Sequence, residues 1–418
     1  SENVLSHIYV HSSTGTLVRV GSRANGDASG NLTVNATGNV SLTASNYGNA
    51  IIGHGALGTA SGNIAVNANG SIALSATGTN AQARIGDAGK NASGNIAVKA
   101  GGALSIVRSS ASTGLIGGFA VNGTLAGDVI VTANSIAGIG DSIFADLAGG
   151  DFTLTSLGTK TINVDDTGTY NSSHNLVVNS GGDVVFGSSL QNAGSGNITF
   201  ISAGDITIGG SGAGGGVAVG SKSGTTKIVA DSLLLSAVNG YAQLGYHGSG
   251  TGAIVATIAG DVTLNGGGST GYYAQIGDGG YNVTGSSRSP ITVTAGGDIA
   301  LNGGSGREAY AQIGNGGAES NSNASGYSET GAIAVTGDTV TLDAGDGTGS
   351  YAQIGHGGYK SGQSLHGTAT LGGNITVSAA AAIRILGGGS GAYAQIGNGG
   401  AESNSNASGY SETGAIAV

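Results

Sequence analysis

The residues of this sequence whose types and spacing could do chemistry are the tyrosines and glutamines of a repeated pentapeptide. An aromatic ring followed two residues later by an amide is a combination that suits a sugar ligand, because the ring packs on apolar surface and the amide hydrogen-bonds. The pentapeptide reads YAQLG once and YAQIG four times, with intervals that widen along the chain, beginning at Tyr241, Tyr273, Tyr310, Tyr351 and Tyr393.

Two interpretations of this motif are open. In a strand whose Ile313 faces the core, Ala311 also faces inward and Tyr310 and Gln312 face solvent. Stacked copies would then form exposed rows, which could simply be like-on-like ladders that stabilise the stack. Alternatively, the rows are a flat platform for a long, repetitive ligand such as a polysaccharide. The candidate ligand-binding residues are Tyr241, Tyr273, Tyr310, Tyr351, Tyr393, Gln243, Gln275, Gln312, Gln353 and Gln395.

Long identical copies favour a function that uses repetition. The stretch YAQIGNGGAESNSNASGYSETGAIAV occurs unchanged at 310–335 and at 393–418. Copying a surface is useful when the partner also repeats, because weak sites in series add up to tight attachment. It is equally useful when only length matters.

Two rows of polar residues could suggest a metal site, and for both we favour a structural interpretation. The first row follows each aliphatic-glycine pair, where Asn, Asp and His tolerate positive φ. The second is the aspartate of GGD and AGD corners, where the nine-residue period of calcium-binding β-rolls is missing. The first row comprises His54, Asp87, Asp278, Asn315, His356 and Asn398, and the second comprises Asp128, Asp183, Asp205, Asp261 and Asp298.

Catalysis has little support. The acidic residues are sparse and dispersed, and Glu319 and Glu402 are the same residue of two identical loops. A lone duplicated carboxylate does not make an active site. We therefore predict no catalytic residue, no metal and no cofactor.

The elements that must position these residues are short strands. An aliphatic-glycine pair recurs at nearly even intervals, as Val20-Gly21, Ile52-Gly53, Ile85-Gly86 and Ile116-Gly117. Between these pairs, the runs at 63–66, 71–74 and 83–86 place large aliphatics two residues apart, which is typical of strands. The pattern predicts an all-β fold, a right-handed parallel β-helix with three short strands per coil of about 32 residues. Equivalent residues of successive coils would then stack about 4.8 Å apart.

Regularity divides the predicted solenoid into three segments. Residues 1–134 form regular coils, 135–235 form less regular ones, and 236–418 carry the tyrosine-rich repeats with corner loops after each YAQIG. We interpret the chain as one continuous solenoid and as a piece of a longer protein.

Composition limits the possible partners. The chain has 418 residues, 86 glycines, no cysteine, only 13 basic residues and a net charge of -10, so a nucleic-acid partner is not expected. No apolar run reaches the roughly 18 residues that a membrane-spanning helix requires.

Runs such as SGNIAVNANGSIAL, AGGDIALNGG and GGNITVSA resemble the β-helical shafts of filamentous-haemagglutinin-like exoproteins, which two-partner systems of Gram-negative bacteria secrete. The YAQIGxGG repeats are similar to the repeat region of CdrA-type biofilm matrix adhesins. The resemblance implies export through an outer-membrane two-partner transporter and a secreted or cell-surface location. It also implies attachment in biofilm, with exopolysaccharide or a neighbouring cell surface as the partner. The alternative is a passive extracellular filament without a specific ligand, and self-association is an open possibility.

Overall fold

A computed structural model describes residues 6–109, 111–117, 119–120, 125–138, 147, 149–165, 168–404 and 407–418. The chain divides into two compact units, which we describe separately. Unit 1 comprises residues 1–162 and 172–182, and unit 2 comprises residues 163–171 and 183–418. The described residues contain strands and no helix, so none of them forms a helix able to cross a membrane.

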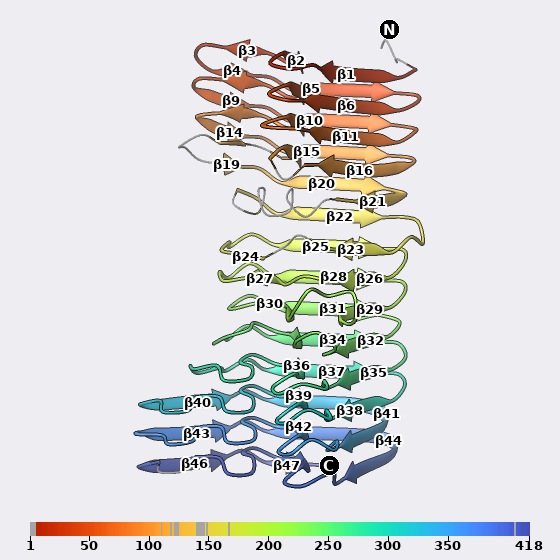
Figure 1. Cartoon of the computed structure of the whole chain (residues 1–418). Coiled ribbons are helices and arrows are strands. Elements are labelled where there is room, and N and C mark those ends of the chain that lie inside the picture. Colours follow the sequence, from red (N-terminus) through yellow and green to blue (C-terminus); the bar gives the residue numbers. More distant parts are fainter. Residues whose placement is uncertain are drawn as a thin grey trace. The chain divides into compact units, whose positions relative to one another are not determined.

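Unit 1 is a stack of parallel strands (Figure 1). The first of its two longer-stranded columns contains β5 (Leu32–Ala36), β10 (Ile64–Ala68), β15 (Ile96–Ala100), β20 (Val129–Ala133), β22 (Phe152–Ser156) and β25 (Leu176–Ser180). The second contains β1 (Ile8–Ser12), β6 (Val40–Ser45), β11 (Ile72–Thr77), β16 (Ala103–Arg108) and β21 (Ser135–Ala137).

Three columns of shorter strands complete unit 1. One contains β2 (Leu17–Val20), β7 (Asn49–Ile52), β12 (Gln82–Ile85) and β17 (Thr113–Ile116). The next contains β3 (Arg23–Ala24), β8 (Gly55–Ala56), β13 (Ala88–Gly89) and β18 (Phe119–Ala120). The last contains β4 (Ala28–Ser29), β9 (Thr59–Ser61), β14 (Asn91–Ser93) and β19 (Leu125–Ala126).

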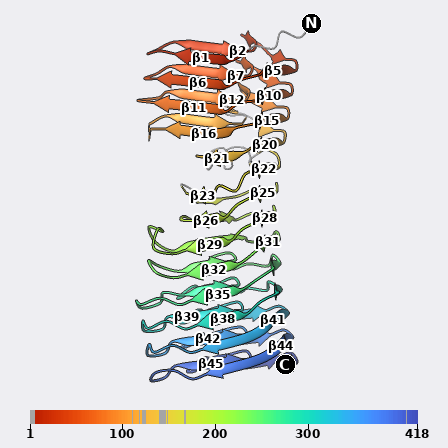
Figure 2. The ribbon, with the colours of Figure 1, turned by 90° about the vertical axis from the view of Figure 1, so that its right-hand side faces the viewer.

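Unit 2 repeats this stacking with three main columns (Figure 2). The first contains β28 (Ile198–Ser202), β31 (Thr226–Ala230), β34 (Ile254–Ile258), β37 (Ile291–Ala295), β41 (Ile333–Asp343), β44 (Ile375–Leu386) and β47 (Ile416–Ala417). The second contains β26 (Val184–Phe186), β29 (Ile206–Gly209), β32 (Leu233–Ser236), β35 (Val262–Asn265) and β38 (Ile299–Asn302), followed by the second halves of β41 and β44. The third contains β24 (Thr169–Tyr170), β27 (Leu190–Asn192), β30 (Val217–Ser221), β33 (Ala242–Leu244), β36 (Ala274–Ile276), β39 (Tyr310–Ile313), β42 (Tyr351–Ile354) and β45 (Tyr393–Ile396).

The core consists of aliphatic columns, and its origin is visible in β10. Ile64 and Val66 are buried while the residues between and after them are partly exposed, as period-two alternation requires. Ile64 pairs with Ile96, the equivalent residue of the next coil. The predicted strands at 63–66, 71–74 and 83–86 correspond to β10, β11 and β12. The predicted parallel β-solenoid is confirmed, and its right-handed sense and its three strands per coil stay predictions.

The segments that follow β39, β42 and β45 are more structured than the loops that the sequence indicates. They form a column of their own from β40 (Gly326–Thr330), β43 (Thr368–Gly372) and β46 (Gly409–Thr413), at the left of the lowest coils in Figure 1. A small apolar cluster of Tyr327, Leu365, Ala369 and Leu371 fixes this column. Every residue of β39 and β42 is buried, so both faces of these strands are covered.

Candidate functional site: a buried ladder of tyrosine and glutamine

The YAQIG strands stack in register in the third column of unit 2. Tyr310 pairs with Tyr351 and Gln312 pairs with Gln353. The same register continues to the next copy, and Gln243 and Gln275 extend it in the other direction. Identical residues therefore lie directly above one another, which is the arrangement that the sequence predicts.

The tyrosines form a continuous stack of aromatic rings. Centroid distances along the column are 5.2, 4.7, 4.6 and 5.0 Å, and neighbouring ring planes differ by 12°, 3°, 5° and 7°. His247 stacks at 4.5 Å on the ring of Tyr241. These separations are within the range in which aromatic pairs attract one another.

The glutamines lock each coil to the next one. The Gln312 Oε1 accepts a hydrogen bond from the Tyr351 hydroxyl (3.0 Å) of the next coil. Its Nε2 donates to the carbonyl oxygens of Gly355 (2.9 Å) and Gly357 (2.8 Å), also in that coil. The pattern repeats at every step, with hydroxyl-to-Oε1 distances of 2.9, 3.1 and 3.3 Å in the other three pairs. Each of these glutamines therefore uses both ends of its amide within the protein.

The predicted exposure of this face is wrong. Tyr310 and Tyr351 are 0% exposed, Tyr273 is 1% exposed, and the first four glutamines of the ladder are 0% exposed. Tyr241, Tyr393 and Gln395 are partly buried. The reason is that the segments after each YAQIG fold back over the tyrosines, and their Tyr281, Tyr359 and Ala318 pack against the ring stack. A strand covered on both faces does not present its second face to solvent, so alternation alone misplaced these side chains.

Burial also sets the protonation state of the ladder. Desolvation raises the pKa of Tyr273, Tyr310, Tyr351 and Tyr393 well above the ordinary value for tyrosine. The phenols therefore remain neutral hydrogen-bond donors at physiological pH, which is the form that the glutamine oxygens require.

The glycine after each YAQI is needed for close approach between coils. Gly355 has φ of 153°, and a Cβ at this position would lie 1.8 Å from the Gly397 carbonyl oxygen. Gly277 is equivalent, with φ of 151° and 1.9 Å to the Gly314 oxygen. Only glycine combines this backbone conformation with such a contact.

The polar residue after that glycine caps the backbone of the preceding coil. Asp278 accepts from the Tyr246 N–H (2.6 Å), and Asn315 accepts from the Asp278 N–H (3.0 Å). His356 and Asn398 continue the series at 3.1 and 3.0 Å. In unit 1, His54 and Asp87 form the same bonds, to the Ser22 N–H (3.1 Å) and the His54 N–H (2.7 Å). Our explanation by positive φ is wrong, because none of the six is among the residues with positive φ.

These caps require particular protonation states. The His356 Nδ1 accepts the Asn315 N–H, so the proton of the neutral ring is on Nε2, which donates to the Gly331 oxygen at 2.8 Å. Burial lowers the pKa of His356 to about 4, which keeps the ring neutral. Burial raises the pKa of Asp278 to about 7, although the Ser289 hydroxyl donates to its Oδ2.

The aspartates of the GGD and AGD corners are exposed. They have an additional role, because each accepts a hydrogen bond from the next coil. The Asp261 carboxylate accepts from the Asp298 N–H (2.8 Å), and the Asp298 carboxylate accepts from the Thr339 N–H (3.0 Å).

Two buried carboxyl groups beside the ladder were missed by the sequence interpretation. Glu308 is 1% exposed and binds Arg307 (2.8 Å) and the Tyr281 hydroxyl (3.0 Å). Glu329 is also 1% exposed, and its Oε1 accepts from Asn321 (2.8 Å), while burial raises its pKa to about 8. One signal was available for Glu329: in the run GYSET it is two residues from Tyr327, so both must face the same way in a strand.

In the part of the chain that the structure describes, no three metal-ligating side chains come together. No protein-family model, curated protein or solved structure matches the chain. Fold and site together define a class, a parallel β-solenoid whose repeated motif is an internal ladder that joins one coil to the next.

Proposed function

We propose that the chain is the shaft of an extracellular attachment fibre, where the solenoid supplies reach and stiffness. One observation carries this proposal: the repeated YAQIG motif is used for cohesion between coils. Each copy bonds to the next through a ring stack and through a glutamine that spans two coils. Duplicating such a motif extends the stack without adding any new surface chemistry.

The tyrosine and glutamine face is not proposed as the ligand contact, because its inner members are buried. Attachment to exopolysaccharide or to a neighbouring cell would instead use other surfaces. Secretion through an outer-membrane transporter and a location outside a Gram-negative cell belong to the proposal only through the sequence resemblance. Self-association stays an open possibility.

The alternative is a passive filament with no ligand, and the burial of the ladder favours it over a binding platform. Both functions need a rigid shaft. They differ in whether the native chain attaches to anything.

The proposal is tested by changing the copy number. The segment 351–392 runs from one YAQIG motif to the position before the next, so inserting further copies of it keeps the register. Ten added copies should lengthen the particle by about 48 Å, measured by electron microscopy. Retention of beads coated with equal numbers of native or extended chains on a glycan array should be the same.

Retention that rises with copy number would show that the repeats are themselves contact sites, which contradicts the shaft proposal. Added copies that leave the length unchanged would contradict it as well. Equal retention above that of uncoated beads supports attachment, whereas no retention of either chain supports the passive filament.

A further inference from the structure

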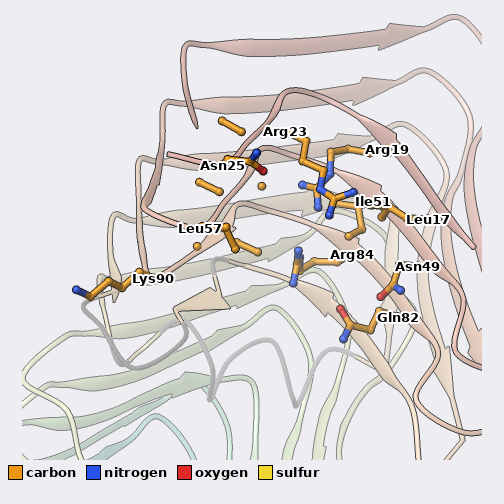
Figure 3. A pocket seen from close by; sticks show the side chains of 15 residues that line it. Leu17, Arg19, Arg23, Asn25, Asn49, Ile51, Leu57, Gln82, Arg84 and Lys90 are labelled. Atoms are coloured by element: carbon orange, nitrogen blue, oxygen red, sulfur yellow. The ribbon is translucent and has the colours of Figure 1, made fainter. Parts of the chain in front are cut away.

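Unit 1 has a pocket on the side of its coils with a volume of about 630 Å³. Its walls come from β2, β7 and β12 and from the short strands and corners around β3, β8 and β13 (Figure 3). A volume in the range of roughly 300 to 1,000 Å³ is typical of small-molecule sites. Nothing in the sequence interpretation or in the shaft proposal uses this pocket.

The pocket is cationic in a chain that is acidic overall. Arg19, Arg23, Arg84 and Lys90 line it, which is four of the 13 basic residues of a chain whose net charge is -10. No carboxylate is among the described residues that line it. Asp87, outside the lining, interacts electrostatically with Arg84 and Arg19. The described lining itself holds four cations and no carboxylate, so it carries an excess of positive charge.

The coil register brings the arginines together. Arg19 and Arg84 both pair with Ile51, from opposite sides, so they occupy the same position two coils apart. Arg23 pairs with Gly55 in the adjoining column. Figure 3 shows the head groups of the three arginines around the middle of the pocket, with Lys90 at its edge.

Gly55 makes the space for one of these head groups. A Cβ on Gly55 would lie 2.6 Å from the Arg19 Nη2 and 2.7 Å from its Cζ. Gly55 is not among the glycines with positive φ, so an added methyl group would strain no backbone and would instead displace the flexible Arg19 head group. The Arg19 Nη1 donates to the Gly53 oxygen at 2.9 Å, while its buried Nε has no hydrogen-bond partner among the described residues.

Holding these cations together without a ligand is unfavourable. Arg84 is 4% exposed, and burial, followed by the nearby charge of Arg19, lowers its pKa to about 10. Desolvated like charges destabilise one another, and a bound anion would offset both costs. Arginine is also the side chain whose planar fork matches a carboxylate.

The uncharged lining indicates what kind of anion fits. The amides of Asn25, Asn49 and Gln82 can hydrogen-bond hydroxyl groups. Leu17 and Leu57 add apolar surface, and both are exposed, at 40% and 74%. Amides, apolar surface and guanidinium groups in one pocket suit a sugar ring that carries a carboxylate. An inorganic anion would use only the arginines.

We propose that this pocket binds a uronate residue, with its carboxylate on Arg19 and Arg23 and its hydroxyls on the amides. The site does not depend on the shaft proposal, because it rests on unit 1 alone and the shaft proposal rests on the ladder of unit 2. A chain that failed the copy-number test could still bind uronate.

Isothermal titration of the full chain with trigalacturonate tests the proposal, with neutral maltotriose as the matched sugar. Trigalacturonate should bind and maltotriose should not. Arg23→Gln removes an exposed cation and should weaken binding about tenfold or more, as loss of a charge-assisted hydrogen bond does. Gly55→Ala keeps every charge but displaces Arg19, and should also weaken binding. Lys99→Gln, which removes an exposed cation of unit 1 outside the pocket, should leave binding unchanged.

Circular dichroism establishes that each variant is folded before titration. Absence of trigalacturonate binding to the native chain overturns the proposal, as does equal loss of affinity in Arg23→Gln and Lys99→Gln. Binding of inorganic sulfate that depends on Arg23, without binding of trigalacturonate, overturns the assignment to a sugar and leaves a simple anion site.

Discussion

Replacing Gln312 with leucine should markedly lower the free energy of unfolding of unit 2. Leucine fills a similar volume but cannot hydrogen-bond, so it leaves the Tyr351 hydroxyl and the Gly355 and Gly357 oxygens without the partner they have in the native ladder. Each buried polar group left unsatisfied costs about 1 to 3 kcal/mol, and neutral groups such as these belong to the lower half of that range. Three such groups give an expected loss of about 3 to 6 kcal/mol.

The chain supplies two matched controls. Gln395 has the same motif context, yet its amide donates only to the Asn398 oxygen (2.9 Å) and none of the described tyrosines donates to it, so Gln395→Leu should cost about 1 kcal/mol. Tyr351→Phe removes one hydroxyl and leaves one neutral glutamine oxygen unsatisfied, so it should cost about 1 to 2 kcal/mol.

Urea unfolding followed by near-ultraviolet circular dichroism is a suitable assay, because the chain has 14 tyrosines and no tryptophan, and five tyrosines form the stack. Solenoids can unfold in several steps. Hydrogen exchange of the Gly355 amide, which donates to the Ile313 oxygen (2.9 Å), therefore localises the effect. Equal midpoints for Gln312→Leu and Gln395→Leu would refute the argument that the amide locks adjacent coils.

Three further predictions concern the surroundings of the ladder. The folded-state pKa of Glu329, about 8, is above its ordinary 4.5, so the contribution of Glu329 to the free energy of unfolding should fall as pH rises from 4.5 to 8. Glu329→Gln should abolish this fall in thermal melts, and an unchanged pH profile would contradict the prediction. The folded-state pKa of His356, about 4, is below its ordinary 6.5, so its contribution should be lost as pH falls from 6.5 to 4. His356→Asn should remove that loss without unfolding the chain, because Asn315 makes the same cap one coil earlier, and a variant that keeps the acid sensitivity would exclude His356 as its source. Gly355→Ala should lower the free energy of unfolding in urea by about 3 kcal/mol or more, through backbone strain and the clash with the Gly397 oxygen. Gly387→Ala should be neutral because the space around Gly387 is open, and similar losses in the two variants would argue against the close approach of Gly355 to the next coil.

The polar corner residues show how much of the structure local sequence patterns can predict. The sequence interpretation placed His54, Asp278 and Asn315 at corners and gave them a structural role, and their positions follow from the period alone. The reason for these residue types was assigned incorrectly. Positive φ was inferred, whereas these side chains are at the corners because they accept a hydrogen bond from the backbone of the preceding coil. That hydrogen bond joins residues a whole coil apart in the sequence, so the residues near each partner do not predict it.

The arginine pocket could not be predicted from the sequence, for a similar reason. Arg19 and Arg84 are two coils apart in the chain, and their proximity follows only from the register through Ile51. Gly55 is one of 86 glycines in the sequence, and nothing in its own neighbourhood distinguishes it from the rest.

By itself, the sequence determined the parallel solenoid, because period-two aliphatics that recur at a regular interval can bury their side chains only by stacking on their own copies. It determined also that identical motifs stack on one another. Only the tertiary structure decided which face of the YAQIG strand meets water. The exposure of that face depends on whether the segment after the strand leaves the coil or folds back over it. Here the segment folds back, because its Tyr281 and Tyr359 make apolar contacts with the ring stack. Burial of the tyrosines, and with it the change from a binding platform to an internal ladder, is therefore a property of packing between segments and not of the repeated motif.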